Sequence, residues 1–138
     1  MELGTVSYAA KDGIARVVLN RPDQLNAISP GLLEDLDKVC AAVEGDPTVR
    51  AVTLTAAGRA FCAGADLKAV RELSPDPEKW ARFMRLWHRV FNRIEALPVP
   101  VVAGVHGLAL AGGLELTLVA DLVVADEGAR LGDQHANF

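Results

Sequence analysis

Strand and helix patterns alternate along this chain, and this alternation constrains its fold more than any other feature. Apolar residues at helical spacing over residues 30–43 lie between two apolar runs rich in β-branched residues, 14–19 and 49–55. Ser29 and Pro30 mark the start of the helix, because serine caps free N–H groups and proline fits the first helical turn. A helix that joins two consecutive strands favours a parallel strand pair. The sequence therefore predicts an α/β fold with parallel strands.

The same reasoning extends to the rest of the chain. Asp12 and Gly13 lie between two strand-like runs and form a favoured hairpin turn, which predicts an antiparallel pair near the N-terminus. After Asp76 and Pro77, apolar residues at helical spacing continue to Leu97, and we interpret this stripe as core and not as a cofactor-binding surface. Further elements are expected as short helices at 67–73 and 114–120, strands at 99–105, 122–125 and 130–132, and a loop at 107–113.

Composition and charge restrict the classes of function. The chain has 138 residues, of which 51% are hydrophobic, and a formal net charge of -4. These values fit one soluble globular domain spanning residues 1–138. Charges of both signs are mixed along the chain, so neither nucleic acid nor a membrane is an expected partner. The longest apolar stretch, 97–110, is broken by prolines and glycines, and the first residues lack a signal-peptide pattern. We therefore expect a cytoplasmic protein.

The two cysteines show no metal-binding or disulfide spacing. Cys40 falls within the predicted helix, where a free cysteine behaves as a small hydrophobic residue. Cys62 lies beside glycine in a loop, and nothing next to it would activate a thiolate. We expect Cys62 to fill space in a pocket wall without acting as a nucleophile, and no metal site is predicted.

Two loops are expected to leave the carboxyl ends of strands, where ligands bind in α/β folds. The first contains Ala63, Gly64, Ala65 and Asp66, and the second ends in a Gly-Gly pair at 112–113, directly before a predicted helix. Glycine allows a ligand to approach backbone N–H groups closely, and these groups are unpaired at a helix N-terminus. If the two strands lie close, one N–H from each loop can point at the same oxygen atom, as in an oxyanion hole. Asp66 is also expected to cap the helix that follows it.

Glu115 is the only ionisable residue between His106 and Asp121, and it has a leucine on each side. Desolvation among apolar neighbours would favour its neutral form, which suits a carboxyl that donates and accepts a proton near neutral pH. A structural role is the alternative, because a glutamate in the first turn of a helix interacts favourably with the helix dipole.

Several motifs together resemble the signature of the crotonase family, which contains the enoyl-CoA hydratases and isomerases. The matching segments are 61–67 (FCAGADL), 98–116, 120–125, 21–22 and 25–27. Their order and spacing are highly specific, and the similarity extends over essentially the whole chain. The resemblance implies the crotonase-like (ClpP/crotonase) fold, an α/β superhelix of repeated β-β-α units, and assembly as a homotrimer or a dimer of trimers.

The resemblance also implies a substrate and a set of site residues. The substrate would be an acyl-CoA thioester, with coenzyme A as part of the substrate and no separate cofactor. The thioester oxygen would bind the N–H groups of Ala65 and Gly112. Glu115 would match the first of two glutamates with which the family's hydratases, a class of lyases, add water to a 2-enoyl-CoA. The residues that would bind the acyl-CoA are Gln24, Asn26, Ala63, Ala65, Asp66, Leu67, Lys68 and Gly112.

The sequence departs from the family pattern at the second catalytic position, where His135 stands in place of a glutamate. Histidine transfers protons near neutral pH, so His135 is a catalytic candidate, with a hydrogen-bonded pocket or interface role as the alternative. The departure leaves three competing functions open: enoyl-CoA isomerisation, another enolate-forming reaction, and non-catalytic binding of an acyl-CoA.

His88 is a further candidate. A dehalogenase-like branch of the family is similar in placing a working histidine at this point of the long helix, whereas a packed or interface histidine is the simpler interpretation. Family members are nearly twice as long as this chain. We therefore expect the C-terminal part of the family's domain, with much of the trimer contact surface, to be absent.

Overall fold

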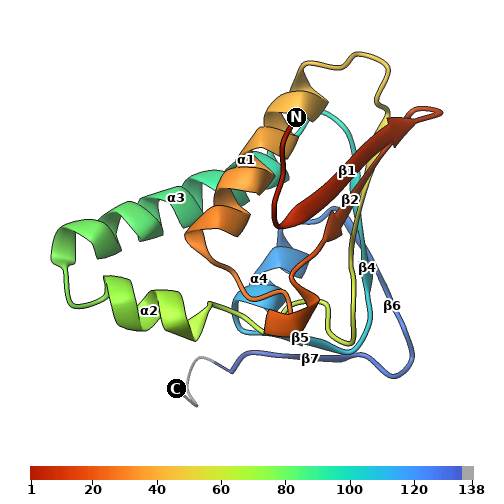
Figure 1. The fold of residues 1–138 in the computed structure, drawn as a ribbon. Helices are drawn as coiled ribbons and strands as arrows, with labels where there is room; N and C mark the ends of the chain where they lie inside the picture. Colours follow the sequence, from red (N-terminus) through yellow and green to blue (C-terminus); the bar gives the residue numbers. More distant parts are fainter. Residues whose placement is uncertain (135–138) are drawn as a thin grey trace.

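The computed structural model describes residues 1–134. A five-stranded sheet has the strand order β1-β2-β3-β4-β6, and a separate small sheet joins β5 to β7 (Figure 1). The strands are β1 (Val6–Lys11), β2 (Ile14–Leu19), β3 (Ala51–Ala56), β4 (Val101–Val105), β5 (Leu108–Leu110), β6 (Leu122–Ala125) and β7 (Arg130–Gly132). The helices are the short 3-10 helix η1 (Pro22–Gln24), α1 (Pro30–Glu44), α2 (Leu67–Leu73), α3 (Pro77–Glu95) and α4 (Gly112–Leu118).

The hairpin and the parallel strands confirm the predicted order of elements. β1 and β2 are antiparallel neighbours, and Asp12 and Gly13 at their turn have positive φ angles of 54° and 81°. From β2 onward the larger sheet is parallel, with β3 between β2 and β4, and with β6 beside β4. The carboxyl ends of β3 and β4 therefore lie next to each other at one edge of the sheet, which is where the two predicted loops begin.

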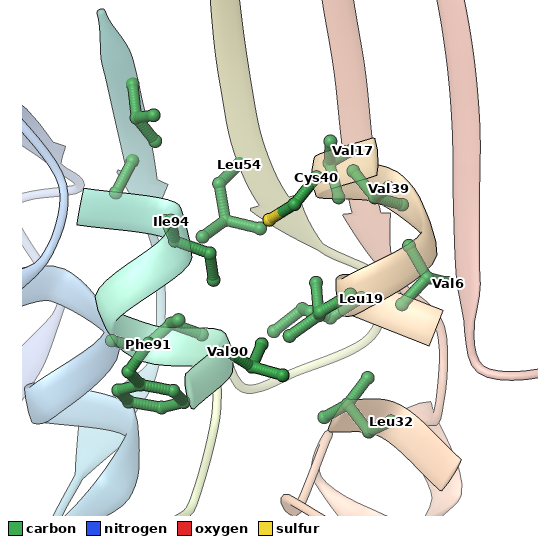
Figure 2. Close-up of a cluster of buried hydrophobic side chains, with 14 of the residues drawn as sticks. Val6, Val17, Leu19, Leu32, Val39, Cys40, Leu54, Val90, Phe91 and Ile94 are labelled. Atoms are coloured by element: carbon green, nitrogen blue, oxygen red, sulfur yellow. The ribbon is translucent and has the colours of Figure 1, made fainter. Parts of the chain in front are cut away.

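One face of the sheet is covered by helices. Buried side chains alternate with less buried ones along β2, β3 and β4, as expected of strands covered on one side. Helices α1 and α3 lie together beside the sheet (Figure 1). Figure 2 shows Val17 and Leu54 of the sheet in one buried cluster with Cys40 of α1 and Ile94 of α3. Burial of each aliphatic side chain contributes about 1.5–3 kcal/mol to the free energy of folding. The layer between the sheet and these helices is therefore the hydrophobic core.

The two long helices begin where the sequence predicts. The Ser29 hydroxyl accepts the N–H of Leu32 at 3.2 Å and caps α1, and the Asp76 carboxylate accepts the N–H of Glu78 at 3.0 Å and caps α3. Each cap satisfies N–H groups that have no partner inside the helix. Helix α3 is 19 residues long. Of the helices in the described part of the chain, none has both the length and the apolar character needed to cross a membrane.

Two predictions around the second loop are wrong. The predicted loop at 107–113 contains a strand, β5, which pairs in parallel with β7. The three residues of β5 are too few to show the alternation of apolar and polar side chains that identifies a strand. Its partner, β7, lies beyond α4 and β6 along the chain. Helix α4 begins at Gly112, two residues before the predicted start at Leu114. Glycine has a low helix propensity, which favours placing Gly112 and Gly113 in the loop before the helix. In the structure both lie in the first turn of α4, packed closely against their neighbours.

The edge strand β6 leaves an apolar surface uncovered. All four of its residues are exposed, including Leu122 and Val124 at 62% and 66%. Leu118 at the end of α4 is also exposed. A patch of apolar side chains on an edge strand is characteristic of a surface that other protein atoms cover.

Candidate active site

A cavity of about 620 Å³ opens beside the two predicted loops. Its volume falls within the range of small-molecule sites, and most of its lining is apolar. Asp66 and Lys68 supply its charged side chains. The lining residues are Gln24, Leu25, Ala27, Ala63, Ala65, Asp66, Leu67, Lys68, Val70, Trp87, Leu108, Leu110, Ala111 and Gly112.

The first loop presents the backbone of Ala65 to this cavity. Ile28 forms a parallel bridge with Ala65, in which the N–H of Ile28 donates to Gly64 O at 2.8 Å and the N–H of Asp66 donates to Ile28 O at 2.9 Å. This pattern uses the groups on either side of Ala65. Within residues 1–134, the N–H of Ala65 itself donates to no protein acceptor. Gly64 has a φ of +111°, a conformation that favours glycine because it has no Cβ.

The second loop presents the backbone of Gly112 in a similar way. Ala111 has φ 50° and ψ -113°, a region that L-residues rarely occupy and that costs on the order of 1–3 kcal/mol. Its own N–H donates to Gly132 O at 3.0 Å, which ties the loop to β7. The ψ angle of Ala111 sets the direction of the next peptide N–H, that of Gly112. This N–H, at the start of α4, also donates to no protein acceptor in the described part of the chain.

The two loops are in direct contact, as the oxyanion-hole hypothesis requires. A Cβ built on Gly64 would lie 3.2 Å from Leu110 O and 3.6 Å from Gly112 N. Just before these contacts along the chain, Cys62 pairs with the strand β5. The N–H of Cys62 donates to Leu108 O and its carbonyl accepts the N–H of Leu110, both at 3.0 Å. One cavity-lining residue from each loop, Ala65 from the first and Gly112 from the second, is thus held near the other on a hydrogen-bonded frame.

Glycine is required at positions 112 and 113 by close contacts. A Cβ on Gly112 would lie 2.7 Å from Cζ2 of the Trp87 indole and 3.1 Å from Cδ1 of Ile28. A Cβ on Gly113 would collide with the carbonyl oxygen of Cys62. The pair therefore lets the first turn of α4 lie directly against α3 on one side and against the first loop on the other.

Asp66 caps α2, as predicted. Its carboxylate accepts the N–H groups of Lys68 at 2.9 Å and Ala69 at 3.2 Å, and the second oxygen accepts from Arg21 at 2.9 Å. Burial alone would raise the pKa of the Asp66 carboxyl, but the hydrogen bonds from Arg21, Ala69 and Lys68 outweigh burial and hold the pKa below its usual range. Asp66 is therefore an ionised group at neutral pH.

Asn26 does not line the cavity, although its neighbours Gln24 and Leu25 do. Its side chain is fully buried, and its amide nitrogen donates to Ala57 O at 2.8 Å and to Ala60 O at 2.9 Å. Its amide oxygen accepts the N–H of Arg21 at 2.8 Å. The side chain is thus committed to the protein backbone. It ties the chain before the first loop to the turn at 21–27, and the predicted part of Asn26 in acyl-CoA binding stays a prediction.

Of the three proton-transfer candidates, the structure describes Glu115 and His88. Glu115 is half-buried in α4, and neither Glu115 nor His88 is among the described residues that line the cavity. His88 is exposed on α3, next to Trp87, which does line it. His135 lies outside the residues that the structure describes.

Trp87 is the aromatic residue of the cavity lining, and sequence reasoning missed its place there. The apolar stripe of α3 was correctly assigned to the core, and Trp87 is buried within it, but Trp87 also forms part of the cavity wall. Helical spacing alone shows which face of α3 is apolar. It does not show that one ring of that face reaches past the core to the backbone of Gly112.

Cys62 is buried, and this agrees with the prediction that it is not a nucleophile. Burial raises the pKa of its thiol to about 11, against a weaker opposing effect of a hydrogen bond from the Gly64 backbone. A thiol of this kind is protonated at neutral pH and is unreactive.

Comparisons with known proteins agree with the geometry. A family model described as enoyl-CoA hydratase/isomerase matches residues 9–138. The short-chain-enoyl-CoA hydratase of Clostridium acetobutylicum is 39% identical over 133 residues, which are 96% of this chain and 50% of that protein. The chain spans about half the length of the curated relatives it matches.

Solved structures show the same fold. The crystal structure of an enoyl-CoA hydratase/isomerase from Xanthobacter autotrophicus Py2 has a TM-score of 0.92 and 34% identity, covering 98% of this chain and 51% of that one. The enoyl-CoA hydratase from Bacillus anthracis has a TM-score of 0.90 and 34% identity, covering 97% and 52%. The predictions of family and fold are both confirmed: the chain has the crotonase fold and belongs to the enoyl-CoA hydratase/isomerase family.

Proposed function

We propose that the protein catalyses the reversible addition of water to a 2-enoyl-CoA thioester. The observation that carries this proposal is a pair of N–H groups, those of Ala65 and Gly112, on two contacting loops at an apolar cavity. Neither donates to a protein acceptor within residues 1–134. Addition of water to the double bond places negative charge on the thioester oxygen in an enolate-like transition state. Fixed N–H donors stabilise such charge, and each is worth about 10²–10³-fold in kcat.

The cavity suits the reacting end of an acyl-CoA. Its apolar wall, which includes Trp87 and Leu110, would hold the acyl chain, while Lys68 would meet the anionic part of coenzyme A. Coenzyme A is then a portion of the substrate, and the reaction needs no separate cofactor. The similar proteins named as enoyl-CoA hydratases support this choice of substrate.

Glu115 is proposed as the acid/base group. It follows Gly112 by three positions in α4, so the two residues share one face of the helix. Helical side chains lean toward the N-terminus of their helix, which directs the Glu115 carboxyl toward the turn that carries the Gly112 N–H. A carboxyl in that place can give a proton to, or take one from, the carbon next to the thioester.

His135 is proposed as the second polar group at the site, because the resemblance to the family places it where the second catalytic glutamate is expected. We also propose that the protein acts in the cytoplasm, as a homotrimer or a dimer of trimers. If His135 cannot activate water, the same oxyanion hole and a single carboxyl would serve the competing reaction, a shift of the double bond in a 3-enoyl-CoA.

The test is direct. The purified full-length protein is incubated with crotonyl-CoA, and the absorbance of the conjugated thioester is followed. Loss of absorbance with formation of a 3-hydroxyacyl-CoA is the expected result. No loss, together with double-bond migration on a 3-enoyl-CoA, would assign the protein to the isomerases. Binding of both thioesters without any turnover would identify a non-catalytic acyl-CoA-binding protein.

A further inference from the structure

We propose that Arg21 is a positioning residue, whose guanidinium holds the Ala65 N–H in the direction that a thioester oxygen requires. The inference rests on the proposed oxyanion role of Ala65. Arg21 does not line the cavity, so its effect on a bound substrate is exerted through the first loop and not through contact.

The guanidinium joins two segments that line the cavity. One of its amino groups donates to the carbonyl oxygen of Ala27, and the other donates to the Asp66 carboxylate at 2.9 Å. Ala27 directly precedes Ile28, and Asp66 directly follows Ala65. The guanidinium therefore spans the parallel bridge between Ile28 and Ala65 and is bonded to the residue beside each bridge partner.

The bridge holds the backbone on either side of Ala65 through a single residue, Ile28. Its two hydrogen bonds converge on Ile28, and the residue before Ala65 is Gly64, which has more conformational freedom than any other residue type. The ion pair adds an attachment through the side chain of Asp66, the residue that follows Ala65. A charge-assisted hydrogen bond to a carboxylate is shorter and stronger than one between neutral groups, which makes it suited to this purpose.

Arg21 is itself held in place. Its N–H donates to the Asn26 side chain at 2.8 Å, and its carbonyl accepts the N–H groups of Gln24 at 3.0 Å and Asn26 at 2.9 Å. Only 18% of its side chain and 14% of that of Asp66 is exposed, so solvent screens the pair weakly. The backbone of Arg21 is thus held by hydrogen bonds, and its largely buried guanidinium pairs with the loop that contains Ala65.

The experiment compares Arg21→Met and Arg21→Lys with the unmodified full-length protein by two measurements. The first is the kcat and KM for crotonyl-CoA. The second is the absorption band of bound 2,4-hexadienoyl-CoA, which moves to longer wavelength when its carbonyl oxygen accepts hydrogen bonds. Arg21→Met is expected to lower kcat by about 10–100-fold, since small misplacement of catalytic groups has effects of this size, with a much smaller change in KM. The band of the bound ligand should move less, and Arg21→Lys should recover part of both losses.

Arg89→Met is the matched control. Arg89 also forms an ion pair, with Asp37 at 2.7 Å, but this pair is far more exposed and joins α1 to α3 away from the cavity. The Arg89→Met variant should have the same kcat and the same absorption band as the unmodified protein. The double variant Arg21→Met with Asp66→Asn should lose no more than the more affected single variant, because both changes break the same contact.

The outcomes separate the inference from the proposed function. The positioning role would be overturned if Arg21→Met, saturated with ligand, had the kcat and the band shift of the unmodified protein. This holds even if the melting temperature of the variant were lower. If Arg21→Met does not fold, full values in Arg21→Lys and Asp66→Asn would overturn it in the same way. Absence of any band shift in the unmodified protein would instead contradict the oxyanion hole itself.

Discussion

The indole of Trp87 occupies the space that a side chain at Gly112 would need, with 2.7 Å between Cζ2 and a Cβ placed on the glycine. The contact brings an aromatic wall from α3 next to one of the two proposed oxyanion donors. The acyl group of a substrate held by that donor would lie beside this ring. Packing in the core and the shape of the site therefore depend on each other.

Gly112→Ala should lower kcat/KM for the thioester by about 10²–10³-fold, the loss expected when one oxyanion donor is displaced. The added methyl group must push either the indole or the first turn of α4 away. Gly31→Ala is the control, since a Cβ there has 3.9 Å to its nearest neighbour, the hydroxyl of Ser29. Steady-state kinetics check the prediction. A Gly112→Ala enzyme with the kinetics of Gly31→Ala would contradict the prediction that a side chain at this position displaces the donor.

Glu115→Gln should bind acyl-CoA with nearly unchanged affinity, because glutamine has the same size and keeps its polarity. It cannot exchange a proton as a carboxyl does, so kcat should fall by about 10²–10⁴-fold. Calorimetric titration with a non-reacting acyl-CoA measures the affinity, and the crotonyl-CoA assay measures kcat. Unchanged turnover would refute the assignment of Glu115 as the acid/base group.

Asn26→Leu should destabilise the fold by about 2–5 kcal/mol, because it leaves the carbonyls of Ala57 and Ala60 and the N–H of Arg21 without their partner in or beside the core. Denaturant unfolding of the variant measures this loss. Asn20→Ala, at an exposed position, should change the free energy of unfolding by less than about 0.5 kcal/mol. Equal stability of the two variants would contradict the structural role given to Asn26.

Stability at acidic pH should depend on Asp66. Its pKa in the folded protein lies below that of an unfolded aspartate, so the unfolded chain binds the proton more tightly. The stabilisation is therefore present above the unfolded pKa of about 3.9 and is lost as pH falls through the lower folded value. In Asp66→Asn this part of the acid-induced loss should disappear, leaving a flatter profile of unfolding free energy below about pH 4. If the unfolding free energies of Asp66→Asn and the unmodified protein fell in parallel below about pH 4, Asp66 would not be a source of the acid-induced loss.

The elements near the site differ in how well the sequence could predict them. The bounds of α2 follow from Asp66 and the apolar residues after it, because a cap acts within one helical turn. The start of α4 did not follow from local rules, and the contact that requires glycine at position 112 comes from the distant ring of Trp87. Non-local contacts also account for β5, whose hydrogen bonds join it to β7 and to Cys62.

The site itself was predictable in outline. The two loops could be identified because glycines and a helix start lie within a few residues of each other. Their contact depended on β3 and β4 being neighbours, which the parallel order of elements suggested and the sheet confirms. The links made by Arg21 and Asn26 could not be derived, because each joins segments that are separated along the chain and no spacing rule connects them.

The two proposed donors are main-chain groups whose directions depend on the unusual backbone of Gly64 and Ala111. Exchange of one side chain for another near the cavity cannot remove a main-chain N–H, and only proline at position 65 or 112 would do so. Under the proposed function, new side chains around a bound thioester would change the fate of the enolate during evolution, while the main-chain donors that allow the enolate to form would be inherited. A histidine at position 135 is a substitution that this separation permits.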